Sequence, residues 1–599
     1  MSADVIRKRS EVPEEFTWNL KDIFKSDEAW LKAEKEAGEF VGRARPFEKH
    51  LGDDAKTLLA WYRLNDEATI KLESLFGYAH MKSDQDTTNG HYLDFVGRAR
   101  RIGVMISGAF AFADPEIMKI PDAKLKQFFR DEPELETYRR NIEVLRKRAK
   151  HVLSPKEEAI LAAANAVSSS PSTINSVLQN ADMSWPDVRD GEGKKHPLTN
   201  GSFVSLLESP DRAFRRRVFQ TYYRELGRFA NTVAASLDGQ FLQLNFYSNA
   251  RKYGSTLEAS LADTEVPVPV YTNLIQAVHE NLQPMYRYVA LRKRVLNVRE
   301  LHMYDVYTPI VQDSQSKVPF EEAKSTILKA LSVLGRDYTA LLQKGFKNRW
   351  IDVYENVGKR SGAYSSGAAR PHPYVLLNYK DNLDSMFTLA HEMGHALHSY
   401  HSNQAQPVNL SDYVIFVAEV ASTVNEVLLM KYLLKETKDK KERAYLINHF
   451  LDSFKGTLYR QTMFAEFERF MGEASENGTT LTAEFLKQKY LELNQLYFGP
   501  DMTSDPEIAL EWARIPHFFY NYYVFQYATG YSAAVAIANR ILTEGAPAVK
   551  DYKAFLSGGS SKDPISLLKI AGVDMSTPKP VTDALTMFGE LVDEMEKLI

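Results

Sequence analysis

Two histidines stand four residues apart in the segment His391-Glu392-Met393-Gly394-His395. In a helix, residues at positions i and i+4 lie on one face, so both imidazoles can reach the same metal ion. Imidazole nitrogens bind zinc at about 2.0–2.1 Å. Glu392 is rotated by about 100° from His391, which makes it a poor third ligand but lets it face a metal-activated water. The segment therefore predicts a hydrolytic zinc centre with His391 and His395 as ligands and Glu392 as general base.

A pattern this short also occurs by chance, so a third ligand is needed. The apolar segment from residue 412 to 426 predicts a buried helix in which Glu419 is costly unless it is paired or bound to metal. Glu426 follows two turns later on the same face, where a carboxylate can orient a ligand histidine through its second ring nitrogen. Two histidines and a glutamate with one open position form a catalytic zinc set. We expect one Zn²⁺ per chain, with Glu419 as third ligand.

His398 continues the face that carries the two ligand histidines. It lies seven residues after His391, about 10 Å along the helix axis, which is too far to share the ion. We therefore expect His398 to pack beside the site.

A second candidate cluster lies near the C-terminus, where five tyrosines occur in the fifteen residues that begin at His517. Most of these rings are expected to pack in the core, but each buried hydroxyl needs a hydrogen-bond partner. A histidine beside several tyrosines also offers donors for the negative charge that develops when a carbonyl is attacked. We predict that His517 and at least one tyrosine belong to the site; Tyr523 and Tyr527, one turn apart, are the leading candidates.

The rest of the chain is predicted to be mostly helical, with the zinc helices at 384–402 and 412–434 and the His/Tyr segment at 512–535. Asp384 is expected to cap the first of these helices. The exception is a flexible segment, 362–371, followed by a β-branched and aromatic strand, 374–379. We expect this strand to be an edge that pairs with an extended peptide, and the 362–367 loop to close over that peptide.

Composition limits the other classes of function. The chain has 599 residues, a net charge of −4 and no cysteine, which excludes disulfides, a thiol nucleophile and cysteine-bound metal. The net charge gives no positive electrostatic field that would favour binding to nucleic acid, and no apolar run has the length of a membrane span. We expect a cytoplasmic protein without nucleic-acid or membrane partners, and leave its oligomeric state open. A provisional division places an N-terminal helical region at 1–200 and a catalytic region at 201–599.

Several motifs together resemble a known family. They are Arg360–Tyr364, Leu376–Tyr379, Thr388–Ser399, Phe416–Thr423, Ile515–Phe518, Tyr527–Gly530, Ser557–Ser560 and Ala571–Met575, with further similarity at 198–212 and 249–253. The sequence is similar to oligoendopeptidase F, of the thimet-oligopeptidase-like zinc peptidases, over nearly its whole length. One departure is Phe525, where relatives often carry tyrosine; this favours Tyr523 and Tyr527.

The resemblance implies His391, His395 and Glu419 as zinc ligands, Glu392 as general base, and His517 with nearby tyrosines as oxyanion stabilisers. It also implies a helical, clam-like enclosure around a deep central cleft that admits short unstructured peptides. Two alternatives remain open. A zinc carboxypeptidase would need a cation for the substrate C-terminus, such as Arg514 or Arg370, and a non-catalytic peptide-binding protein would not need Glu392.

Overall fold

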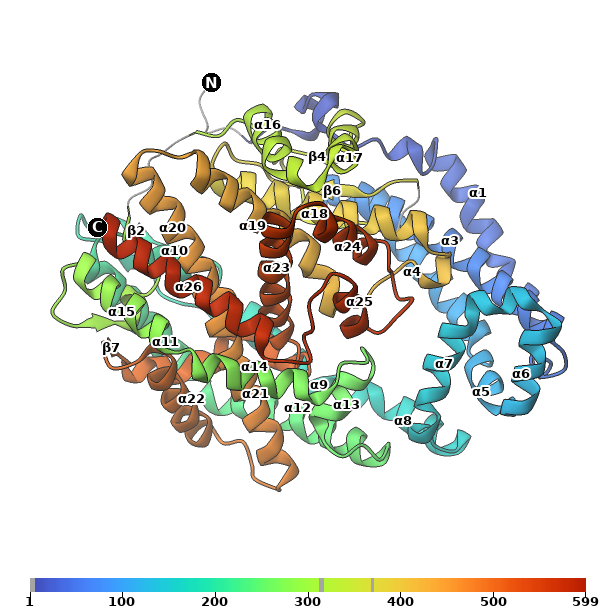
Figure 1. The fold of residues 1–599 in the computed structure, drawn as a ribbon. Coiled ribbons are helices and arrows are strands. Elements are labelled where there is room, and N and C mark those ends of the chain that lie inside the picture. Colours follow the sequence, from blue (N-terminus) through green and yellow to red (C-terminus); the bar gives the residue numbers. More distant parts are fainter. Residues whose placement is uncertain (1–5, 312–316, 368–370) are drawn as a thin grey trace. The chain divides into compact units, whose positions relative to one another are not determined.

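A computed structural model of the protein describes residues 6–311, 317–367 and 371–599, and most of these residues lie in helices (Figure 1). The predicted mostly α fold is confirmed, as is the small β element beside the helix that carries His391. The clam-like enclosure around a deep cleft stays a prediction.

The chain folds into two compact units, each built from separate stretches of sequence. Unit 1 contains residues 1–150, 315–432 and 537–572, and unit 2 contains residues 151–314, 433–536 and 573–599. Helices α19 and α23 each contain a boundary between these stretches. The division at residue 200 concerns domains rather than these units and stays a prediction.

Unit 1 is assembled from helices around a short sheet. Its helices are α1 (Asp27–Gly38), α2 (Phe40–Ala44), α3 (Ala55–Gln85), α4 (Gly90–Phe110), α5 (Ala113–Lys119), α6 (Asp122–Asp131), α7 (Arg139–Lys147), α16 (Phe320–Ala330), α17 (Arg336–Lys347), α18 (Leu383–Ala405), most of α19 (Ile415–Glu436), α24 (Ala546–Leu556) and α25 (Pro564–Ile570). Its strands are β4 (Ile351–Asp352), β5 (Tyr364–Ser366) and β6 (Tyr374–Leu376).

Unit 2 is also helical. Its helices are α8 (Pro155–Ser168), α9 (Ser170–Val177), α10 (Phe203–Leu207), α11 (Arg212–Gly227), α12 (Ala230–Ala250), α13 (Thr256–Ala262), α14 (Val268–Glu280), α15 (Gln283–Val295), α20 (Lys440–Phe454), α21 (Arg460–Glu476), α22 (Ala483–Phe498), the first part of α23 (Phe525–Glu544) and α26 (Lys579–Leu598). Two-residue strands pair as β1 (Val188–Arg189) with β2 (Lys195–His196), and β3 (Leu301–His302) with β7 (Met502–Thr503).

The sheet of unit 1 corrects one prediction. Strand β6 pairs in parallel with β4 and antiparallel with β5, so it is the central strand of the order β4-β6-β5. The expected edge strand at 374–379 is therefore wrong, because both sides of 374–376 are already hydrogen-bonded. Beyond β6, the N–H groups of Leu377 and Tyr379 donate to the carbonyls of Asp352 and Val353. The outer strands of the sheet are β4 and β5, and β5 lies inside the segment predicted to be a loop.

Strand β6 packs against the N-terminal helices. Tyr374 and Leu376 are fully buried in the same hydrophobic cluster as Trp30, Trp61 and Leu75 of helices α1 and α3. The sheet also packs against α18. Burial of these large side chains, at about 1.5–3 kcal/mol each, holds the sheet in one position beside the helix that carries His391 and His395.

Helix α18 begins as a capped helix, but the cap is not the predicted residue. The side chain of Asn382 accepts a hydrogen bond from the N–H of Ser385 at 2.9 Å, while Asp384 lies in the first turn. Asparagine and aspartate are about equally good caps, and the backbone at Asn382 has the extended conformation that a cap requires. Asp384 instead places a negative charge near the helix N-terminus, which the helix dipole favours.

Gly394 allows α18 and α19 to touch backbone to backbone. A Cβ atom at Gly394 would lie 2.5 Å from the Cα of Ser422 and 2.7 Å from the carbonyl oxygen of Ala421. Because these are main-chain atoms of a packed helix, they cannot move aside individually. The glycine between Glu392 and His395 therefore sets the distance between the two helices that carry the candidate ligands.

Substituting Gly394→Ala is expected to destabilise the protein by about 1–3 kcal/mol, the usual cost of overpacking, and to weaken zinc binding by moving the helices apart. Chemical denaturation and zinc titration measure the two effects. The matched control is Gly108→Ala in α4, where a Cβ would meet nothing within 4 Å; it should leave stability unchanged or raise it. Equal behaviour of the two variants would contradict the close contact.

Candidate metal centre and active site

Three predicted ligand atoms meet between α18 and α19. The Nε2 atoms of His391 and His395 are 3.2 Å apart, and Oε2 of Glu419 lies 3.3 Å from the first and 3.4 Å from the second. The helices position them because His391 and His395 are one turn apart, and Glu419 lies three residues before Ser422, where α19 crosses Gly394. The three side chains are half-buried.

This triangle fits a zinc ion. A tetrahedral ion with ligands at about 2.0–2.1 Å separates its ligand atoms by about 3.3 Å, which matches the three edges of 3.2–3.4 Å. The local charges also favour a bound cation. The two imidazoles are surrounded by three carboxyl groups, those of Glu392, Glu419 and Glu426, which interact with them electrostatically. A cation at the centre of the triangle would compensate this negative charge.

The candidate ligands are themselves held by neighbours. Oε1 of Glu426 lies 3.2 Å from Nδ1 of His391, so the Nδ1–H group can donate to it and leave Nε2 as the metal-facing acceptor. The Ser422 hydroxyl lies 3.3 Å from Oε2 of Glu419. Burial opposes the charge on His391, yet Glu426 and Glu419 hold its pKa well above the usual value. Burial also opposes the charge on Glu419, but the two imidazoles hold its pKa well below the usual value.

Glu392 lies on a different face of α18 from the two histidines. Its side chain is buried, at 6% exposed, and its Oε2 atom has no hydrogen-bond partner among the described residues. Burial raises the pKa of Glu392, while the charges of His391 and His395 lower it. A carboxyl group with a raised pKa beside a hydrolytic centre is suited to take up and release a proton.

His398 packs, as its spacing predicts. It is 1% exposed, its ring stacks on Tyr413 with centroids 3.8 Å apart, and Phe555 of α24 covers it at 5.3 Å. Burial lowers the pKa of His398 to about 3, so the ring is neutral at physiological pH. It contributes apolar contacts rather than charge.

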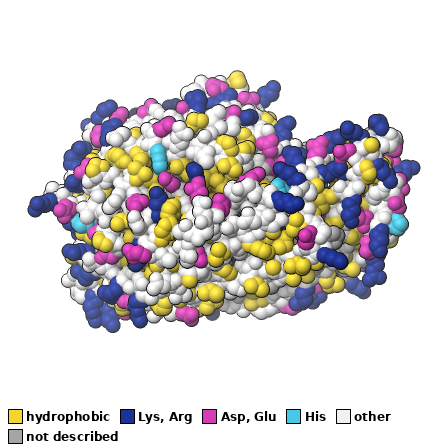
Figure 2. Space-filling view, turned by 90° about the horizontal axis from the view of Figure 1, so that it is seen from below, with side chains coloured by type: hydrophobic (Ala, Val, Ile, Leu, Met, Phe, Trp, Pro, Cys, Tyr) yellow, Lys and Arg dark blue, Asp and Glu magenta, His cyan; other side chains and the backbone are white. Residues whose placement is uncertain are grey.

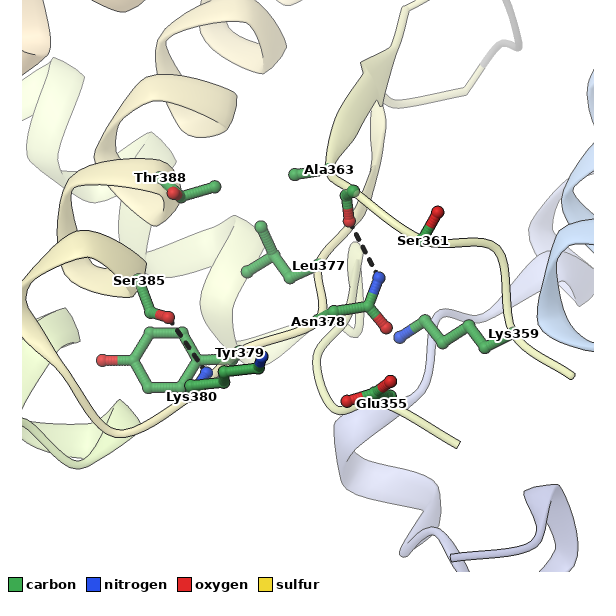
Figure 3. A pocket seen from close by; sticks show the side chains of 11 residues that line it. Glu355, Lys359, Ser361, Ala363, Leu377, Asn378, Tyr379, Lys380, Ser385 and Thr388 are labelled. Carbon is green, nitrogen blue, oxygen red and sulfur yellow. Dashed lines mark hydrogen bonds between the residues drawn. The ribbon is translucent and has the colours of Figure 1, made fainter. Parts of the chain in front are cut away.

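A pocket of about 380 Å³ opens beside the N-terminal half of α18 (Figure 3). Ser385 and Thr388 of α18 line it, together with the segments 361–363 and 377–380. The side-chain amide of Asn378 donates to the carbonyls of Arg360 and Gly362, at 2.9 and 2.8 Å, and so fixes the backbone that leads into β5. Thr388 precedes His391 by three residues, so the pocket borders the helix one turn before the first ligand.

The predicted His/Tyr cluster forms within unit 2. The hydroxyl of Tyr527 lies 3.4 Å from Nε2 of His517, and the ring of Tyr523 lies nearly parallel to the His517 ring at 6.0 Å. Burial lowers the pKa of His517. His517 sits in a short 3₁₀ helix, Pro516–Phe519, whereas α23 begins only at Phe525. These residues belong to unit 2 and the three candidate ligands to unit 1, so a joint role stays a proposal.

Comparisons with known proteins identify the family. A model of peptidase family M3 matches residues 205–587, and a model of oligopeptidase F matches residues 116–185. The oligopeptidase PepF of Bacillus subtilis is 47% identical over 100% of this chain and 89% of its own. The chain belongs to peptidase family M3. Its resemblance to oligoendopeptidase F is thereby confirmed.

Two solved structures superpose on nearly the whole chain. One is oligoendopeptidase-F from Enterococcus faecium, 38% identical with a TM-score of 0.76 over 96% of this chain and 99% of its own. The other, from Chlamydophila abortus and provisionally described as a peptidase, is 34% identical with a TM-score of 0.91 over 99% and 100%. As a member of peptidase family M3, the chain is a hydrolase of the metallopeptidase class.

Surface and membrane predictions are tested only in part. No helix among the described residues has the length and apolar character that crossing a bilayer requires. On the face drawn in Figure 2, basic and acidic side chains are interspersed. The expected cytoplasmic location and the expected absence of nucleic-acid partners stay predictions, and the oligomeric state stays open.

Asn425 and Tyr338 support the site but were not predicted from the sequence. The Asn425 side chain donates to the carbonyl of Ala390 at 3.0 Å and accepts from the Tyr338 hydroxyl at 2.9 Å. It therefore binds α19 to the turn of α18 that precedes His391, and it is fully buried. The available signal was its position in an apolar stretch next to Glu426, because a buried amide must find partners.

Proposed function

We propose that this member of peptidase family M3 is a zinc-dependent endopeptidase that hydrolyses internal bonds of short, unstructured peptides. The observation that carries the proposal is the triangle of His391, His395 and Glu419, which has the dimensions of a zinc ligand set. The names of the relatives from B. subtilis, an oligopeptidase, and E. faecium, an oligoendopeptidase, support peptides as the substrate class.

The proposed mechanism divides the work among this chain's residues. When bound by the three ligands, one zinc ion per chain would act as a Lewis acid and lower the pKa of water toward about 7. Glu392 accepts the proton of the attacking water and returns it to the leaving amine. Glu426 keeps the His391 ring in the orientation and tautomer that direct Nε2 at the centre of the triangle.

We place the peptide along the pocket beside α18. An extended substrate can pair with the outer edge of β5, since strand addition uses main-chain hydrogen bonds and tolerates varied side chains. This replaces the pairing with 374–379, which the sheet order excludes. Asn378 would keep the adjoining backbone in place through its two hydrogen bonds. A bound-peptide structure without contacts to β5 would refute this placement.

His517, with Tyr523 or Tyr527, is proposed to stabilise the negative charge that develops on the scissile carbonyl oxygen. Substituting His517→Phe is expected to lower kcat by about 10²- to 10³-fold, the usual effect of losing one such donor, and to leave zinc affinity near that of the wild type. Tyr523→Phe and Tyr527→Phe each remove only a hydroxyl and show which one contributes. The matched control is Tyr520→Phe, at an exposed tyrosine. Equal losses of kcat and zinc in His517→Phe would contradict the role.

A quenched fluorogenic peptide with both ends blocked separates the endopeptidase from the alternative carboxypeptidase. We expect cleavage of internal bonds at a rate similar to that of the free-ended peptide, because no terminal carboxylate is required. A carboxypeptidase would leave the blocked peptide intact. One candidate cation for such an enzyme, Arg514, is already paired with Glu511 at 2.7 Å, and the other, Arg370, lies outside the described residues. A protein that only binds peptides would cleave neither substrate.

A further inference from the structure

Two consecutive residues between His517 and Tyr523 adopt a left-handed backbone. The φ angles are 56° at Asn521 and 60° at Tyr522. Asparagine tolerates this conformation, but it is unusual for a bulky aromatic residue such as tyrosine. Such a backbone conformation persists only where its surroundings hold it. The contacts of Tyr522 therefore identify the residues that stabilise this turn.

Tyr522 lies across helix α21 and is held at both ends. Its N–H group donates to Oε1 of Glu468 at 2.6 Å, and its hydroxyl lies 2.8 Å from the hydroxyl of Thr256. Gly472, one turn after Glu468, makes room for the ring: a Cβ there would lie 1.7 Å from the Tyr522 hydroxyl oxygen. Tyr522 is buried, at 2% exposed. Tyr522 thus fastens the turn to α21, and Gln240 of α12 holds the same turn by donating to Oδ1 of Asn521 at 2.8 Å.

Among the described residues, the Glu468 side chain makes one hydrogen bond, the one that it accepts from the N–H group of Tyr522. It is fully buried, it forms no ion pair within the described part of the chain, and its Oε2 atom has no partner there. Burial raises the pKa of Glu468 to about 8, so the group is neutral at pH 7. An apolar side chain of similar size would pack at this position with less desolvation cost. The contact to the strained turn explains the carboxyl group.

The buried position of Tyr522 fixes the directions of the neighbouring side chains of Tyr523 and Tyr527. With Tyr522 buried, Tyr523 lies beside His517 at 6.0 Å between ring centroids, and Tyr527 follows with its hydroxyl 3.4 Å from Nε2 of His517. We propose that Glu468 is a positioning residue: it fixes the left-handed turn at Asn521–Tyr522 and through it the arrangement of His517, Tyr523 and Tyr527. The inference rests on the proposed catalytic role of these three residues.

Three variants of the full-length zinc-loaded enzyme test the inference. Glu468→Leu removes the acceptor and should lower kcat by roughly 10- to 100-fold, as misplacement of catalytic groups does, with KM and zinc content unchanged. Glu468→Gln keeps an acceptor oxygen in a neutral group of the same shape and should stay within about twofold of the wild type. Val592→Ala, which creates a cavity beside α26 of the same unit, is the control for a loss of stability without a change at Glu468.

The outcomes separate the inference from the function beneath it. If His517→Phe lowers kcat but folded Glu468→Leu does not, the positioning role is overturned and the proposed function stands. If His517→Phe leaves kcat unchanged, the role of the cluster itself is wrong. If Glu468→Leu fails to fold, Gly472→Ala displaces the Tyr522 ring and should lower kcat in the same way; an unchanged kcat there overturns the inference. A loss in Val592→Ala equal to that in Glu468→Leu also overturns it.

Discussion

Replacing Glu392 by glutamine is expected to lower kcat by roughly 10²- to 10⁴-fold, the range that positioned general bases contribute. Glutamine keeps the shape of the side chain but cannot accept the proton of the attacking water. Zinc content and thermal stability should stay near the wild type, because Glu392 is not part of the triangle of His391, His395 and Glu419. Steady-state hydrolysis of a blocked oligopeptide, with zinc measured on the same sample, gives both quantities.

The control for Glu392→Gln is Glu436→Gln, the same change at the exposed C-terminal end of α19. It should stay within about twofold of the wild type, as surface substitutions usually do. If Glu392→Gln also lost its zinc, the residue would act through the metal site rather than as a base. If it kept full activity, another group would have to take the proton.

Substituting Glu419→Gln should weaken zinc binding by more than about 100-fold and abolish hydrolysis at limiting zinc, since it removes the one anionic ligand beside two neutral imidazoles. Glu426→Gln should weaken binding by only about 10- to 100-fold, the usual effect of losing a group that supports a ligand histidine. Competition with a chelator of known affinity measures both. The order of the two effects is the test: a larger loss in Glu426→Gln would mean that Glu426, rather than Glu419, binds the metal.

The proximity of the three candidate ligands was predictable because the spacing within each helix is local. His391 and His395 lie one helical turn apart, and Glu426 follows Glu419 by two turns, so helix periodicity alone places each pair on one face. That the two helices meet there was inferred from the cost of burying Glu419 in an apolar stretch. The structure adds Gly394, which permits that meeting through contact with main-chain atoms of α19.

Features that depend on distant pairing were not predictable. Whether 374–379 is an edge or a centre strand depends on β4 and β5, and each of these is too short to give a periodic signal. Asn382 and Asp384 are similar caps, so local preference did not distinguish them. The contact between Glu468 and Tyr522 joins residues 54 positions apart, and the left-handed turn that it holds contains no glycine to mark it.

The most direct test of the zinc centre is anomalous diffraction from crystals of the zinc-loaded protein at the zinc absorption edge. We expect one strong peak per chain at the centre of the triangle formed by His391, His395 and Glu419, at about 2.0–2.2 Å from one atom of each. A peak elsewhere in the chain, or coordination that omits the Glu419 carboxylate, would contradict the proposed centre and the hydrolytic mechanism built on it.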